Sequence, residues 1–220
     1  MKKIILISTI IVLVSFIFSC DKEKEKAYYR FSQLDSERLL PYKEGQVLKF
    51  INQNNEERDF SIYAVNTSLK NLYTVGMGFF TSYAASYFYY DSKSITLIDS
   101  KMEQPFYINF NRWPLNTEIA KENIYTEYPS SFSGAIQYMR FWNVWDDAII
   151  DYEQRKIEMT VSGKTYKNVF VLSSGSDSII EYPWPDGTTQ IRDVNVIFYD
   201  EIEGIIGFDD LNGNEWRLIN

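Results

Sequence analysis

Apolar and polar residues alternate along much of this chain, most clearly in its last third. Ile157, Met159 and Val161 alternate with polar residues, as in a strand with one buried face. Segments of this kind lie at 157–161, 166–172, 178–182, 188–199, 204–208 and 215–219. Ser162-Gly163-Lys164 joins the first pair and Asn212-Gly213 lies between the last pair, so a β-hairpin is predicted at each place.

The earlier part of the chain predicts strands separated by polar interruptions. The expected strands lie at 45–52, 58–65, 94–98, 106–113 and 136–145. Polar residues at 66–68 and 91–93 predict turns on either side of an aromatic stretch. A helical turn or two is expected within 117–125, and 146–155 fits a strand slightly better than a helix. Residues 27–40 predict either a short helix on the domain edge or a partly ordered linker.

Composition favours a β-rich fold. The 220 residues include 17 Tyr, 15 Phe and 5 Trp, and aromatic side chains fit the half-buried surface of a pleated sheet. A chain of this length can bury a sizeable core without disulfides. We predict a mainly β protein, an antiparallel β-sandwich or a partly open β-barrel with one or two short helices, formed as a single domain over 41–220.

The N-terminus has the pattern of an export signal. Met1-Lys2-Lys3 is basic, and the apolar run from Ile4 to Phe18 is too short for a comfortable membrane span. Ser19 then precedes Cys20, the one cysteine of the sequence. We expect a signal peptide over 1–19. The alternatives to lipidation are an ordinary cleaved signal with a leftover cysteine and an uncleaved N-terminal helix.

Ile17, Ser19 and Cys20 resemble a bacterial lipobox. The resemblance implies cleavage before Cys20 and addition of acyl chains, such as palmitate, to it. Several chains give stable membrane anchoring. The charged run 21–26 predicts a solvated spacer and resembles the acidic stretch that follows the lipid-bearing cysteine in surface lipoproteins of the Bacteroidota. Residues 20–40 are therefore expected to form a lipid anchor and flexible tether.

Two hairpin segments are also similar to those of uncharacterised outer-membrane lipoproteins of the Bacteroidota. They run from Val161 to Val169, with Gly163-Lys164 at the turn, and from Gly204 to Leu218, with Asn212-Gly213 at the turn. The matching positions are turn and core residues rather than catalytic ones. The resemblance implies a lipid-anchored β-rich domain at the outer membrane, on the cell surface or, alternatively, on the periplasmic face.

Charge and missing residue types exclude several functions. Removing Lys2 and Lys3 with the signal leaves 20 basic and 30 acidic residues, a net charge of −10. This charge argues against nucleic acid as a partner and against electrostatic docking on anionic lipid. The sequence has no histidine, which removes Ser-His-Asp catalysis and His-bound metals. We expect no enzyme activity, cofactor or metal.

Trp184 is the strongest binding candidate in the sequence. It lies between Pro183 and Pro185, and because proline fixes φ, this loop can present the indole rigidly. Aromatic platforms bind sugars by stacking and bind proteins as hot spots. Tyr182 and Asp186 complete the predicted ligand-binding set. The competing interpretation is a tryptophan that folds back over a sheet end.

Other aromatic and acidic clusters have simpler explanations. Trp142 and Trp145 would point to opposite faces of a strand, so one is expected in the core while the other could be exposed, and core is the favoured interpretation. Asp209–Glu215 has the composition of a calcium loop, but its glycine is misplaced for an EF-hand and a hairpin turn explains the segment.

Two further patterns remain as lesser hypotheses. A glycoside hydrolase needs paired carboxylates, and the candidates are Asp146, Asp147, Asp151 and Glu153. Asp177-Ser178-Ile179 resembles a short O-glycosylation acceptor of exported Bacteroidota proteins, with Ser178 as the modified residue.

The leading functional hypothesis is a non-catalytic binding or structural lipoprotein of the envelope, with a glycan or another envelope protein as its partner. The alternatives are a carrier of lipid or another hydrophobic ligand, facing the periplasm, and a carboxylate-based hydrolase. A large apolar cavity would favour the carrier, an acid pair in a cleft the hydrolase, and an exposed aromatic patch the binding protein.

Overall fold

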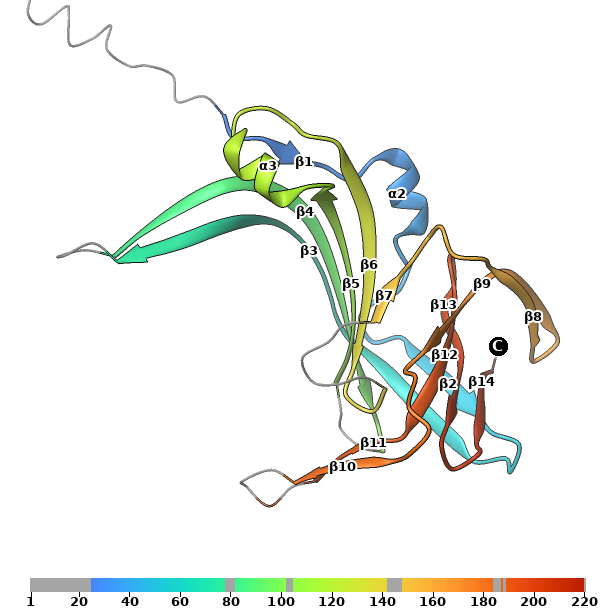
Figure 1. The fold of residues 1–220 in the computed structure, drawn as a ribbon. Helices are drawn as coiled ribbons and strands as arrows, with labels where there is room; N and C mark the ends of the chain where they lie inside the picture. The colour runs from blue at the N-terminus through green and yellow to red at the C-terminus, as the bar shows by residue number, and fades with distance from the viewer. Residues whose placement is uncertain are drawn as a thin grey trace, which may run out of the picture.

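The computed structural model describes residues 25–77, 82–101, 105–141, 148–183, 187 and 189–219, which form a curled sheet shaped as a half-barrel (Figure 1). In chain order, the elements are β1 (Tyr28–Tyr29), α2 (Gln33–Arg38), β2 (Val47–Ile51), β3 (Glu57–Met77), β4 (Ser82–Asp99), β5 (Pro105–Pro114), α3 (Thr117–Glu122), β6 (Ser130–Tyr138), β7 (Ala148–Ile150), β8 (Ile157–Val161), β9 (Lys164–Ser173), β10 (Ile180–Pro183), β11 (Thr189–Arg192), β12 (Val194–Asp200), β13 (Gly204–Asp210) and β14 (Glu215–Leu218).

The main sheet has the strand order β7-β6-β5-β4-β3-β2-β14-β13-β12-β9-β8, and β1 adds to β4. All neighbours are antiparallel except β1 and β4. Of the two predicted architectures, the partly open barrel is therefore the observed one. Its open side is bridged by two backbone N–H groups, of Asp193 and Val194, which donate to the Arg140 carbonyl at 3.0 and 2.9 Å.

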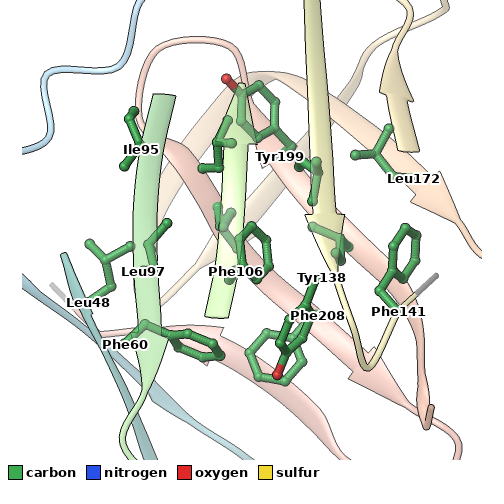
Figure 2. Packing of buried hydrophobic residues seen from close by; sticks show 14 of the residues in the cluster. Leu48, Phe60, Ile95, Leu97, Phe106, Tyr138, Phe141, Leu172, Tyr199 and Phe208 are labelled. Atoms are coloured by element: carbon green, nitrogen blue, oxygen red, sulfur yellow. The ribbon is translucent and has the colours of Figure 1, made fainter. Parts of the chain in front are cut away.

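The main core fills the inside of the half-barrel. Figure 2 shows Leu97, Phe106 and Tyr138 grouped in the interior with Phe208. Aromatic edge contacts are frequent in this core, for example Phe60 with Phe208 at 5.8 Å between ring centroids. Burial of so many large apolar side chains is the dominant stabilising contribution in a domain without disulfides.

A second core lies on the opposite face of the same sheet. Strand β4 places Ile95 and Leu97 in the interior, but Phe88 belongs to a cluster with Tyr29 of β1 and Ala120 of α3. Odd and even positions of a strand point to opposite faces. The buried face of β4 therefore changes between Phe88 and Ile95.

The predicted turns at 66–68 and 91–93 are wrong, because β3 and β4 run straight through both segments. Ser68 pairs with Ser92, and Thr67 pairs with Lys93. Serine and threonine can form the backbone hydrogen bonds of a β-sheet like any other residue, because these bonds use the main-chain N–H and C=O groups. The polar residues mark the place where the buried face changes, rather than a turn.

Beyond this crossing, β3 and β4 form a two-stranded arm that extends away from the body (Figure 1). We use "arm" for residues 66–77 of β3 and 82–92 of β4. The chain enters the described structure beside the arm, where β1 pairs with β4 at Tyr28↔Tyr89. Strand β1 and α3 lie at the base of the arm.

Residues 27–40 pack onto the body, as one of the two interpretations of this segment predicted, so the flexible tether expected over 20–40 does not include residues 27–40. Helix α2 has a capping box, in which Asp35 N–H donates to the Ser32 hydroxyl at 3.1 Å and Ser32 N–H donates to the Asp35 carboxylate at 2.7 Å. Leu40 is fully buried in the main core. No helix within the described ranges is long and apolar enough to cross a bilayer.

The predicted hairpins 157–172 and 204–219 are confirmed as β8–β9 and β13–β14. A helix is confirmed at α3, and the weak preference for strand within 146–155 is confirmed over β7. Strands β10 and β11 form a separate two-stranded sheet that projects from the body (Figure 1).

A buried ionic cluster lies at the end of the barrel where β4 and β6 finish. Arg58 pairs with Asp99, with Nε 2.9 Å from Oδ2, and Arg140 pairs with Asp193, with Nε 2.6 Å from Oδ1. Arg140 also lies 3.9 Å from Asp99. Asp210 is buried nearby and accepts the Trp216 indole N–H at 3.0 Å. Buried charges require such partners, because an unpaired ion is costly to desolvate.

Candidate binding groove

A groove of about 530 Å³ lies between α2 and the β6–β7 side of the sheet. We call it the α2–β7 groove. Its walls are Ser32, Leu34, Asp35, Arg38, Arg112, Ser131, Phe132, Ser133, Ile149, Ile150, Asp151, Tyr152 and Glu153. Its volume lies within the range of ligand sites, which is roughly 300–1,000 Å³.

Helix α2 is fixed against the sheet by an ion pair. Both oxygens of the Asp35 carboxylate accept from Arg112 Nη1, at 3.2 and 3.1 Å. Arg112 comes from β5 and also donates to the Ser130 hydroxyl at 3.0 Å. Asp35 is buried, so this pair holds one wall of the groove in place.

Aromatic rings form another part of the wall. Phe132 stacks on Phe110 of the core, with 5.7 Å between centroids, and contacts Tyr152 at 5.2 Å. Gly134 makes room for Tyr152, since a Cβ at 134 would lie 2.7 Å from the Tyr152 hydroxyl. Burial raises the pKa of Tyr152 above its ordinary value, so this tyrosine stays neutral and acts as a rigid apolar surface.

The groove runs beside an uncovered sheet edge. Strand β6 extends over Ser130–Tyr138, but β7 pairs only with positions 134–136. Residues 130–133 of β6 therefore have no neighbouring strand on that side within the described chain. Ile149 and Leu34 are 62% and 57% exposed, and both line the groove. Exposed apolar residues beside an open strand edge are typical of a protein-binding surface.

The charges of the groove are mostly satisfied within the protein. Arg38 pairs with Glu201 at 2.9 Å and lies over the Tyr152 ring, 5.0 Å from its centroid. The Asp151 carboxylate accepts the Glu153 backbone N–H at 3.0 Å in a turn after β7. The groove can thus offer backbone hydrogen bonds, apolar contacts and an acidic rim.

The structure places two of the predicted carboxylates, Asp151 and Glu153, on this groove, whereas Asp146 and Asp147 lie outside the described residues. Both placed side chains are exposed. A glycosidase acid is typically a carboxyl held in apolar surroundings, and neither of these has such surroundings.

Part of the predicted aromatic site can be placed. Tyr182 lies on β10 and is 37% exposed, while Trp184 and Asp186 are outside the described residues. Gln190, which pairs with Tyr182 in this β10–β11 hairpin, connects it to the body, because its side-chain amide donates to the Met139 carbonyl at 2.9 Å. Ser178 is exposed just before β10. Cys20, Trp142 and Trp145 are also outside the described residues.

The calcium-like segment is a hairpin turn, as its sequence suggested. The Asp210 carboxylate accepts the backbone N–H groups of Asn212 and Asn214, at 2.9 and 3.1 Å, and Gly213 has φ +81°. No group of three or more His, Cys, Asp or Glu side chains suited to a metal ion occurs among the described residues.

The interior of the described barrel holds an apolar cavity of about 10 Å³, lined by residues such as Phe50, Phe106 and Ile197. That volume admits about one water molecule. Lipid chains are far larger, so the half-barrel is a packed core rather than a lumen.

Sequence reasoning offered a short helix within 27–40 but did not predict that it forms a wall of a groove, and it missed the open edge of β6. The one local signal was the spacing of Ser32 and Asp35, which fits a capping box and marks a helix start. The open edge depends on how short β7 is, and short pairing lengths leave no periodic pattern. No protein-family model, curated protein or solved structure matches this chain.

Proposed function

We propose that this protein is a lipid-anchored, non-catalytic binding protein of the cell envelope, which takes an extended segment of another envelope protein into the α2–β7 groove. The observation that carries the proposal is the uncovered edge of β6 at 130–133, flanked by exposed Leu34 and Ile149. An added strand would pair with that edge and lay alternate side chains on the apolar wall.

The groove favours a peptide over the other two ligand classes. A glycan would be recognised by free polar groups around an aromatic face, yet Arg38 and Arg112 are already paired with Glu201 and Asp35. A hydrophobic cargo would need a large interior cavity, and the cavity found in the described core measures about 10 Å³. Tyr182, Trp184 and Asp186 stay predicted as a second contact for the partner.

The tether is tested by Cys20→Ser. Wild-type protein is expected to incorporate labelled palmitate and to fractionate with the outer membrane, and the variant is expected to lose both properties. Retention of the variant in the membrane fraction with unchanged processing would refute the anchoring.

The groove is tested with a phage-displayed library of linear peptides and, in parallel, a glycan array. We expect the library to yield peptides that bind the wild-type protein but not its Ile149→Asp variant. N-methylation of alternate peptide bonds in such a peptide should also abolish binding, because it removes the N–H groups that would pair with β6. The matched control is Ile202→Asp, because Ile202 is 57% exposed but does not line the groove. Binding of glycans instead of peptides, or equal peptide binding by both variants, would contradict the proposal.

A further inference from the structure

The arm carries an aromatic and aliphatic face that is largely exposed. Alternation along β3 places Leu69 and Tyr73 on one face of the arm, and both are 56% exposed. Leu69 lines an open hollow of about 490 Å³ together with Tyr28, Tyr89 and Tyr125. This face is opposite to the one where Phe88 packs against β1 and α3.

The chain reaches this face directly from its N-terminus. Glu25 and Lys26 line the same hollow, and Lys26 donates to the Ser86 carbonyl of β4. Glu25 is only five positions after Cys20, and five residue-to-residue steps span at most about 18 Å when the chain is fully extended. If Cys20 carries acyl chains, the hollow is therefore held within about 18 Å of the bilayer.

The chemistry of the face suits the interfacial region of a bilayer. Tyrosine rings prefer the level of the lipid headgroups, where the ring is buried and the hydroxyl stays hydrated. Arg30 is exposed and lies over the Tyr28 ring, 4.5 Å from its centroid, so its charge is directed to the same region. The nearby Asp91 carboxylate is occupied, because it accepts from the Tyr28 hydroxyl and from Phe31 N–H.

We infer that the arm lies on the membrane surface, with Leu69 and Tyr73 in the headgroup region, and that it orients the body relative to the bilayer. The inference rests on the proposed anchoring at Cys20. The partner is the lipid bilayer itself. A net charge of −10 for the mature chain rules out attraction of the protein to anionic lipid by overall charge. Burial of apolar side chains and the short tether therefore hold the arm on the bilayer.

The test uses the full-length lipoprotein reconstituted into vesicles of phosphatidylethanolamine and phosphatidylglycerol. The mature sequence has no thiol apart from Cys20, so Leu69→Cys or Tyr73→Cys introduces a single site for an environment-sensitive fluorophore. The matched control is Asn54→Cys, in the exposed turn at the other end of β3. Flotation of the vesicles reports anchoring in the same sample.

We expect the protein to float, with blue-shifted emission from positions 69 and 73 that is quenched by lipid-borne quenchers, and with water-like, unquenched emission from position 54. Flotation with water-like emission at 69 and 73 would overturn the arm contact and leave the anchoring intact. A failure to float would overturn both. Equal quenching at all three positions would also contradict an oriented contact.

Discussion

The buried ionic cluster predicts an unusual dependence of stability on pH. Three carboxylates, of Asp99, Asp193 and Asp210, lie near two guanidinium groups, of Arg58 and Arg140. The cluster therefore buries one negative charge in excess. Burial, followed by the charge of Asp210, raises the pKa of Asp193 from the ordinary 3.8 to about 6, although Arg58 opposes the shift.

The sign of the effect follows from linkage between proton binding and folding. A carboxyl group with a higher pKa in the folded state binds its proton more tightly there than in the unfolded chain. The resulting stability is fully present below pH 4 and is lost as the pH rises through about 6. One pKa unit corresponds to about 1.4 kcal/mol, so the free energy of unfolding should fall by about 3 kcal/mol between these limits.

Urea unfolding followed by tryptophan fluorescence, at intervals between pH 4 and pH 8, measures this loss. The matched variant is Asp193→Asn, which keeps the shape of the side chain and cannot titrate. The readout is the slope of the free energy of unfolding with pH, rather than its absolute value, because the substitution also changes the hydrogen bonds of this side chain with Arg140. A slope equal in the two proteins would refute the assignment, as would a wild-type stability that rises over this range.

Two further predictions concern single positions. Gly204→Ala should lower the free energy of unfolding by about 1–3 kcal/mol more than Gly163→Ala does. Both glycines have positive φ (+87° and +82°), but only at 204 would an added Cβ strike the Tyr42 hydroxyl. Equal urea midpoints for the two variants would contradict this. Ser178 is predicted to carry a glycan in the native host, so the intact mass of Ser178→Ala should fall by the mass of the glycan, to that of the acylated polypeptide, and a wild-type mass without a glycan would exclude the modification.

Much of the fold could be predicted from local pattern. The hairpins β8–β9 and β13–β14 combine alternating strands with short turns rich in glycine, and both are local in sequence. The turns predicted at 66–68 and 91–93 are wrong because a run of polar residues does not by itself indicate a turn. Polar residues also occur where a strand changes its buried face, as at Ser92, which is 1% exposed inside a continuous ladder.

The candidate groove was less predictable than the fold. Asp151 and Glu153 were singled out as acids, and they do lie on it. Their neighbours across the groove come from α2, more than 100 positions earlier in the chain. Nothing in a single sequence records that approach, because it depends on the curl of the sheet and on the Asp35–Arg112 pair.

The change of buried face along β4 connects the two proposals. Since β3 and β4 stay paired from the body into the arm, with register shifts at Ile62/Ala64 and Leu72/Tyr73, the arm is not joined to the body by a flexible linker. The β3–β4 ribbon packs against the main core on one face, at Ile95, and against the cluster of β1 and α3 on the other face, at Phe88. Bending the ribbon between these two positions would expose one of the two side chains, so the ribbon resists bending there. An arm fixed on the bilayer would therefore fix the direction in which the α2–β7 groove opens. A tether alone, attached to a freely rotating body, would leave that direction undetermined, so the proposed arm contact would add orientation to the proposed anchoring by acyl chains.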